Sequence, residues 1–170
     1  MRIVYYPDPV LLKPAATLDQ LPGNMEDIVI GMRKVMQLER GIGLAAPQVG
    51  LSLRMILVNA TGEPEDEQWL VNPEIVGFHG KKIWGEEGCL SFPGIWGEVL
   101  RHSRIEVKYQ DLDFQTQTLE AEDLTARILQ HEIDHLAGQI FVNKMRPADK
   151  IRVKPELEEL KARFQSDPPA

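Results

Sequence analysis

The segment EDLTARILQHEIDHLAG, residues 122–138, decides how the rest of the chain is interpreted. Its apolar residues recur at helical spacing: Leu124, Ile128, Leu129 and Leu136. This spacing predicts an α-helix with one buried side. We expect Asp123 or Thr125 to cap its first turn. Gly138 stands where a glycine commonly ends a helix, so the helix is expected to stop there.

Two further helices are expected on either side of the central part of the chain. The first begins near Asn24, a good N-cap residue with Asp27 three positions later, and ends at Gly41. Its apolar side is formed by Ile28, Met32, Val35, Met36 and Leu38. The second covers residues 155–165 and begins with a proline, which is tolerated at the first helical position.

The central part of the chain is predicted to form strands. Residues 54–60 form a short apolar run typical of a buried strand, and residues 69–84 suggest two strand pieces broken at Asn72-Pro73. Residues 98–123 alternate between apolar and polar side chains around a turn at Asp111–Asp113. Strands in the middle and helices at both ends indicate an α+β fold with antiparallel strands.

The glycine-rich stretches 41–50 and 85–94 are interpreted as a loop and a turn between these elements. With 170 residues, the chain suits a single domain over residues 1–170. The last residues, 165–170, are expected to form a flexible tail.

Composition limits the classes of function. Hydrophobic residues make up 43% of the chain and charged residues 26%, which is ordinary for a globular protein. The formal net charge of −7 gives no general attraction to phosphate backbones or anionic lipid, so neither nucleic acid nor a membrane is expected as a direct partner.

Cysteine content and the N-terminal sequence bear on the compartment. The one cysteine, Cys89, has no intrachain partner for a disulfide, which fits a reducing environment. Residues 1–18 contain three prolines and no continuous apolar stretch, so they do not resemble a signal peptide. A cytoplasmic location is expected, with an organelle as the alternative if a transit peptide has been removed.

The two histidines of the opening segment suggest a metal site. His131 and His135 are four positions apart, so both imidazoles face the same side of the helix and reach one ion. Glu132 is rotated by about 100° around the axis, where its carboxylate can act on a water molecule as a general base. A helix that buries histidines and a carboxylate must give them partners, which favours a metal over an exposed polar surface.

A catalytic site of this kind usually has three protein ligands and one position for water. Cys89, between a glycine and a turn, is the preferred third ligand because a cation stabilises its thiolate. A glutamate from the last helix is the alternative found in many H-E-x-x-H peptidases, and the candidates are Glu156, Glu158 and Glu159. His79 and His102 are weaker candidates. A metal-stabilised domain without catalytic activity is a third hypothesis.

Three motifs in order, GIGLAAPQ (41–48), EGCLS (87–91) and QHEIDH (130–135), resemble those of the peptide deformylase family over about residues 2–160. That family removes the formyl group from the N-terminal methionine of new proteins. The resemblance implies an α+β fold in which antiparallel strands pack around a central HExxH helix, with an N-terminal and a C-terminal helix. It also implies an N-formylmethionyl nascent peptide as the substrate and formate as a product.

The resemblance assigns roles to residues of this sequence. Cys89, His131 and His135 match the metal ligands, and Glu132 matches the general acid and base. Gln48 and the backbone N–H of Leu90 match the two donors to the oxyanion. The positions that match substrate-binding backbone are Ile42, Gly43 and Gly88, and Leu124 and Ile128 are expected to line a methionine pocket with Ile42. The family's metal is typically Fe2+, replaceable by Ni2+, Co2+ or Zn2+.

A second interaction and three departures from the family pattern complete these expectations. Glu87 is expected to pair with Arg101 and to fix the segment that carries Cys89. Gly85 replaces a bulkier apolar residue, and Trp96 stands where some members carry an arginine. The C-terminal helix is acidic, whereas a basic one docks on the ribosome in some relatives, so a transient ribosome contact is a weaker expectation.

Overall fold

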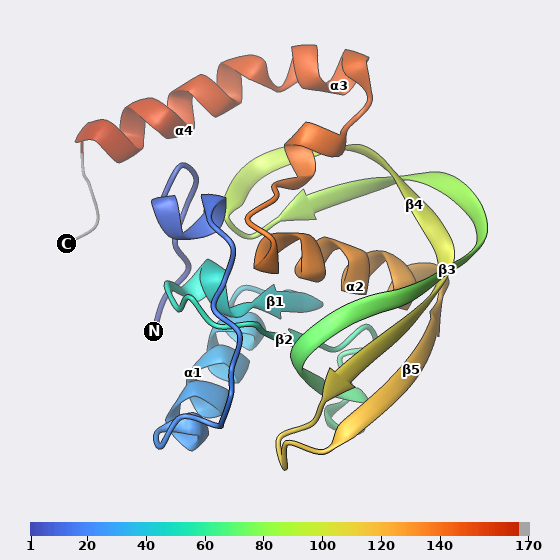
Figure 1. Ribbon diagram of the computed structural model, residues 1–170. Helices are drawn as coiled ribbons and strands as arrows, with labels where there is room; N and C mark the ends of the chain where they lie inside the picture. Colours follow the sequence, from blue (N-terminus) through green and yellow to red (C-terminus); the bar gives the residue numbers. More distant parts are fainter. Residues whose placement is uncertain (167–170) are drawn as a thin grey trace.

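The computed structural model describes residues 1–166 and consists of one five-stranded antiparallel sheet with helices on both sides (Figure 1). The sheet order follows the sequence: β1 (Gly43–Ala45), β2 (Met55–Val58), β3 (Gln68–Cys89), β4 (Phe92–Gln110) and β5 (Thr116–Glu122). The α-helices are α1 (Met25–Leu38), α2 (Asp123–Leu136), α3 (Pro147–Arg152) and α4 (Lys154–Ser166). Short 3-10 helices cover Pro9–Leu12, Ala46–Val49, Pro64–Asp66 and Phe141–Lys144. The predicted α+β class is confirmed.

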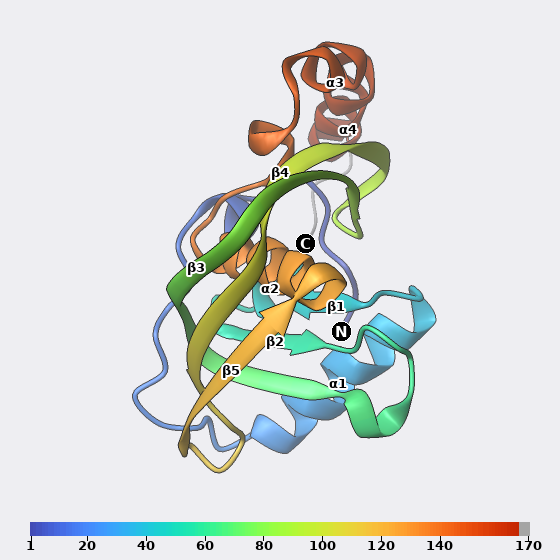
Figure 2. The same ribbon diagram turned by 90° about the vertical axis from the view of Figure 1, so that its right-hand side faces the viewer.

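Helix α2 lies beside the sheet and contacts β1, β2, β4 and β5, with the curved hairpin of β3 and β4 passing around it (Figures 1 and 2). Its apolar side packs against strand residues such as Ile56, Leu70 and Ile105. Ile128, Leu129 and Leu136 are buried as the helical spacing predicts, whereas Leu124 is half exposed because it stands in the first turn at the rim. The amphipathic pattern therefore fixes the face of α2 that the sheet covers.

The N-terminal end of α2 differs from the prediction, and its C-terminal end agrees with it. Glu122 occupies the N-cap position and makes no side-chain cap bond, so the predicted capping by Asp123 or Thr125 is wrong. At the other end, Gly138 has φ of 68° and the Gln139 N–H donates to the Asp134 carbonyl at 2.9 Å, which is the expected glycine-terminated end.

We expect Gly138→Ala to lower the free energy of unfolding by at least about 1–2 kcal/mol, because a non-glycine residue is strained in the left-handed conformation. An added Cβ would also lie 2.7 Å from the backbone carbon of Lys13, which cannot move as a side-chain tip does. Urea denaturation measures the loss. Gly23→Ala, where a Cβ meets nothing within 4 Å and φ is ordinary, is the matched control and should be close to neutral.

Helix α1 has the predicted N-cap position at Asn24, although that side chain makes no cap bond. Ile28, Met32, Val35 and Met36 are buried, but Leu38 is 71% exposed, so its place in the apolar side was wrong. The chain turns away at Arg40, which has φ of 54°, and the Gly41 N–H donates to the Met36 carbonyl at 2.9 Å. The helix therefore ends at Leu38, and the left-handed residue that turns the chain is Arg40 rather than the predicted Gly41.

The glycine-rich stretch 41–50 is not the loop expected from its sequence. It contains β1, which pairs with β2 through Gly43 opposite Val58, followed by the 3-10 helix Ala46–Val49. All residues from Gly43 to Val49 are buried. Small side chains, which suggested a loop, are here what allows a short strand to lie against α2.

The long hairpin of β3 and β4 also departs from expectation. Residues 69–84 lie in one strand, β3, rather than in two pieces; this strand continues to Cys89, and residues 92–94 already belong to β4. The turn is therefore confined to Leu90 and Ser91. The predicted break at Asn72-Pro73 survives as a shift of register between Val71 and Glu74. Pairing with β4 along its whole length stabilises β3 despite its glycines, which local sequence does not reveal.

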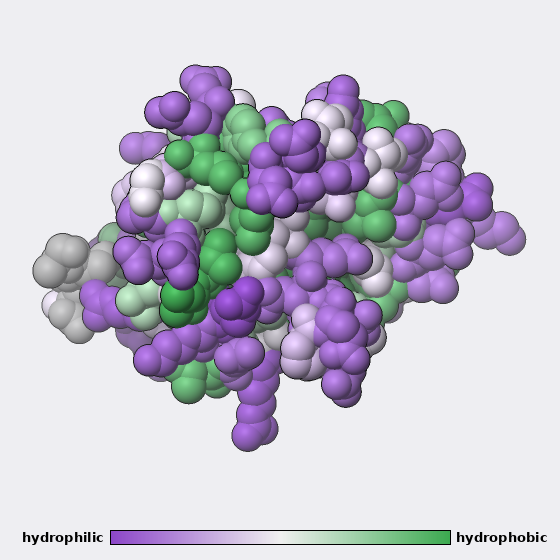
Figure 3. All heavy atoms as spheres, turned by 90° about the horizontal axis from the view of Figure 1, so that it is seen from below, coloured by the Kyte–Doolittle hydropathy of each residue, from purple (hydrophilic) through white to green (hydrophobic). Residues whose placement is uncertain are grey.

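The C-terminal part contains α3, which was not predicted, and α4, which includes the expected helix and begins at Lys154. Helix α4 runs to Ser166, and residues 167–170 of the predicted tail lie outside the described residues. Charged and polar side chains cover most of the face in Figure 3, with small apolar areas between them. Within residues 1–166, no helix has the length and apolar character needed to cross a membrane.

Candidate metal centre

A cleft of about 450 Å³ lies between α2, the start of β1 and the end of β3. It brings together residues that are far apart in the sequence. The expected site residues among its lining are Ile42, Gly43, Gln48, Gly88, Cys89, Leu90, Leu124, Ile128, His131 and Glu132. His135 lies behind them and is 1% exposed. Side chains from three separate motifs therefore face one space.

Three potential metal ligands converge beside this cleft. One ligand atom from each of Cys89, His131 and His135 lies within 4.8 Å of the others, and Cys89 Sγ is 3.2 Å from His135 Nε2. Helix α2 supplies the two imidazoles from successive turns, and the end of β3 supplies the thiol. A sulfur and two nitrogens at this separation fit a tetrahedral divalent cation that keeps one position for another ligand.

The His131 ring is oriented by a carboxylate on its far side. Its Nδ1 lies 2.9 Å from Glu87 Oε2, so Nδ1–H donates there and Nε2 is left as the basic atom. A carboxylate in this position typically fixes the tautomer of a metal-bound histidine and raises its basicity. Glu87 is buried, and its pKa is lowered to about 2: burial alone would raise it, but hydrogen bonds from His131 and Arg101 outweigh that effect.

The electrostatics of the two histidines differ. Burial lowers the pKa of His135 well below its usual value, which keeps this imidazole neutral and able to donate a lone pair. Burial acts in the same direction on His131, yet hydrogen bonds with Cys89 and Glu87 raise its pKa well above the usual value. The thiol and the carboxylate thus favour positive charge between them, as a cation site requires.

Glu132 lies next to the ligands but does not join them. It is 4% exposed, and its Oε2 has no hydrogen-bond partner among residues 1–166. Burial raises its pKa to about 7, so the carboxyl group can both take and return a proton near neutral pH. Gly43 makes room for it, because a Cβ there would lie 2.5 Å from Glu132 Oε1.

Gln48 is buried, and its amide is held in one orientation. Oε1 accepts from the Ala45 N–H at 2.7 Å, so Nε2 points toward Cys89 Sγ at 3.4 Å. One of its two N–H groups can face the sulfur while the other faces the cleft. The Leu90 N–H, at the hairpin turn, has no hydrogen-bond acceptor among residues 1–166. Both groups stand as donors beside the ligand cluster.

The alternative ligands lie elsewhere. Glu156, Glu158 and Glu159 are exposed on α4, and His79 is exposed on β3. His102 is half buried and its ring packs against Phe78. In the part of the chain that the structure describes, the cluster of potential ligands contains none of these residues. The alternative hypothesis, a peptidase-like site whose third ligand is a glutamate of the last helix, is therefore wrong.

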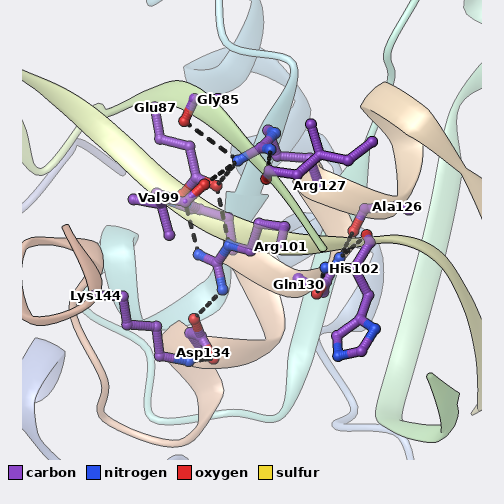
Figure 4. A network of polar contacts seen from close by, with 12 residues as sticks. Gly85, Glu87, Val99, Arg101, His102, Ala126, Arg127, Gln130, Asp134 and Lys144 are labelled. Carbon is purple, nitrogen blue, oxygen red and sulfur yellow. Dashed lines mark hydrogen bonds and ion pairs between the residues drawn. The ribbon is translucent and has the colours of Figure 1, made fainter. Parts of the chain in front are cut away.

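A network of charged groups is centred on Glu87, the carboxylate that contacts His131, and the sequence revealed only part of it. Figure 4 shows Arg101, Arg127, Asp134 and Lys144 of this network. Arg101 donates to both oxygens of Glu87 at 2.9 and 3.0 Å, which agrees with the expected pair. Arg101 also reaches Asp134 at 2.6 Å, and Arg127 reaches Glu87 at 2.8 Å. Neither contact was predicted. For Arg127, the sequence did contain a signal: it is a charged residue one helical turn before His131 on a largely buried helix, so it was bound to need a partner.

An antiparallel sheet holding a helix with two histidines and a glutamate, and a cysteine beside them, defines a metal-dependent hydrolase. Comparison with known proteins gives the particular family. Residues 1–151 match the family model described as polypeptide deformylase. The chain belongs to the peptide deformylase family, metal-dependent enzymes that remove the N-formyl group from nascent peptides.

Individual relatives agree with this assignment. A peptide deformylase of Chlorobium luteolum is 40% identical over 161 residues, which cover 92% of this chain and 84% of the relative. The chloroplastic/mitochondrial peptide deformylase 1B of Arabidopsis thaliana is 38% identical over 97% of this chain and 61% of its own length. A crystal structure of peptide deformylase from Plasmodium falciparum superposes with a TM-score of 0.93 at 38% identity, covering 99% of each chain.

Proposed function

We propose that Cys89, His131 and His135 hold the divalent cation with which this enzyme deformylates nascent peptides. The observation that carries this proposal is the convergence of one sulfur and two imidazoles within 4.8 Å. A cation bound there supplies Lewis acidity toward the formyl oxygen and acidifies a water molecule. The central position of α2 matters here, because it keeps the imidazoles and Glu132 buried.

Glu132 is the proton carrier of the reaction. It takes a proton as the water oxygen attacks the formyl carbon, and it returns that proton to the amine that leaves. Burial raises the pKa of its carboxyl group, which helps the group to hold the proton between the two transfers. Its position one residue after His131, with Gly43 opposite, directs the carboxylate into the cleft.

Gln48 and Leu90 stabilise the charge that develops on the formyl oxygen. Their donors are held before the reaction begins, one by the Ala45 contact and one by the hairpin turn. We expect Gln48→Ala to lower kcat by about 100- to 1,000-fold, as loss of one such donor typically does. KM and metal content should change little. Steady-state kinetics with metal analysis measures this, and an equal rise in KM would instead indicate a role in binding.

The substrate backbone binds along the open edge of the sheet. β1 is the edge strand, and Ile42, Gly43 and Gly88 line the cleft beside it, so an extended peptide can add to this edge as a strand. Leu124, Ile128 and Ile42 provide apolar surface for the methionine side chain. Residues 1–170 act as one catalytic domain in this proposal.

The finer details follow from the chemistry of the ligands. A thiolate with two imidazoles accepts Fe2+, which we propose for the cell, and also Ni2+, Co2+ or Zn2+. The enzyme works in the cytoplasm, or in an organelle of the kind named for the Arabidopsis relative. The charged side chains of α4 balance, with three glutamates and three basic residues, so the helix offers no net positive charge for docking on ribosomal RNA, and the ribosome contact that we propose is a transient one.

One experiment tests the function directly. Anaerobically purified protein should release formate from a formyl-Met peptide, and the same sample should contain about one metal ion per chain. A chelator should abolish the activity, and Fe2+, Ni2+ or Co2+ should restore it. Bound metal without formate release would contradict the proposal and favour a structural role for the ion.

A further inference from the structure

Arg127 makes an unusual set of contacts for a residue on α2. Its Nη1 donates to Glu87 Oε1 at 2.8 Å and to the Val99 carbonyl at 2.9 Å, and its Nη2 donates to the Ile83 carbonyl at 2.8 Å. A longer contact of 3.3 Å joins Nη1 to the Gly85 carbonyl. One guanidinium thus connects α2 to both strands of the long hairpin (Figure 4).

Gly85 makes these contacts possible. A Cβ at this position would lie 2.7 Å from Arg127 Nη2 and 2.8 Å from Cζ, inside the space that the guanidinium occupies. Gly85 and Glu87 are two residues apart on β3, so they share one face of the strand. Because residue 85 has no side chain, the guanidinium of Arg127 has room to lie over the strand and to reach Glu87.

Arg127 and His131 are four residues apart on α2 and contact the same carboxylate. Glu87 Oε1 accepts from Arg127 and Arg101, and Oε2 accepts from His131 and Arg101. Arg101 is shared with Asp134 at 2.6 Å, whose other oxygen bonds Lys144. Removing Arg127 takes away one of the two arginines that hold the carboxylate toward His131 and leaves Arg101 to orient it alone.

We propose that Arg127, together with Gly85, is a positioning residue for the metal centre: it fixes Glu87, which fixes the ring of His131. This inference rests on the ligand roles proposed above. A structural role alone would require only that α2 be joined to the hairpin. A positioning role requires in addition that loss of Arg127 change the metal site itself.

The test uses protein loaded with Co2+, whose thiolate-to-cobalt absorption reports the ligand geometry. We expect Arg127→Ala to release Co2+ about 10-fold faster, as loss of an outer partner of a metal-bound histidine typically does, and to alter the absorption. Arg127→Lys should lie between this variant and the parent, because the single nitrogen of an ammonium cannot reach all the acceptors that two separate guanidinium nitrogens contact. Gly85→Ala should resemble Arg127→Ala, and the double variant should show no further loss.

Arg33→Ala is the matched control. Arg33 forms a partly buried bidentate pair with Glu67, away from the ligand cluster, so its loss removes a comparable ion pair without touching Glu87. Its cobalt spectrum and release rate should equal those of the parent.

The outcomes separate the two proposals. Parent protein without a thiolate-to-cobalt band would overturn the proposed ligands. A normal parent band with unchanged spectrum and release rate in Arg127→Ala would overturn only the positioning role. Fully additive effects of Gly85→Ala and Arg127→Ala would show that the two residues act independently, which contradicts their proposed partnership.

Discussion

Glu132→Gln should reduce formate release by about 1,000-fold or more while metal content and fold are retained, because general acid–base catalysis contributes about 10²–10⁴-fold and this residue serves both transfers. The amide has the shape of the carboxyl group but neither takes up nor releases a proton near neutral pH. Glu132 does not belong to the ligand cluster, so its change leaves the cation in place. The steady-state rate and the metal content of the same preparation measure both parts of this expectation.

The structure also explains why this variant should fold. Burial raises the pKa of Glu132 to about 7, which means that the charged form is costly inside the protein. A neutral amide avoids that cost, and the space beside Gly43 already fits a group of this size. Glu120→Gln, on the exposed part of β5, is the control and should leave the rate unchanged. Full activity in Glu132→Gln would remove this residue from the mechanism.

Cys89→Ala should abolish both metal binding and activity. Loss of an outer partner of a metal site costs about 10- to 100-fold in affinity, so loss of one of three proposed direct ligands should exceed about 100-fold. Bound to a cation, Cys89 would also be the one anionic ligand among the three. Metal analysis after dialysis, together with formate release in the presence of added Co2+, measures the effect.

Glutamate variants provide the contrast for this experiment. Alanine at Glu156, Glu158 or Glu159 should leave metal content and activity at the parent level, since these side chains are exposed on α4. Metal that stays bound in Cys89→Ala would show that the sulfur is not a ligand. The histidines and an unidentified group would then have to account for the site.

Local sequence determined the parts of this protein that depend on a single element. Helical periodicity placed α2 and its buried face, and the i, i+4 spacing placed His131 and His135 side by side. Gly138 marked the end of the helix for the same local reason. Alternation around Asp111–Asp113 likewise located β4 and β5. Such features follow from backbone geometry within a few residues, so a pattern in the sequence carries them.

The ordered motifs identified the family and, through it, the residues expected to meet at the metal, but they did not predict the strand pairing that brings the motifs together. The continuity of β3 through residues 72–89 and the strand in 41–50 were missed, because pairing with a neighbouring strand overcame glycines that locally favour turns. Leu38 was misplaced for a related reason: helical spacing gives a buried side, but the partner surface decides where that side ends.

Only the tertiary structure decided what surrounds the candidate site. Cys89 and His135 are 46 residues apart in sequence, and their 3.2 Å approach depends on how the hairpin curves around α2. The same curvature brings Arg127 into the space above Gly85 and gives Glu87 three donors from two elements. Such contacts arise from the packing of whole elements. The motifs predicted that Cys89 meets the two histidines and that Glu87 pairs with Arg101, but no local pattern records how the elements pack, so the contacts of Arg127 with Glu87 and of Arg101 with Asp134 were not predicted.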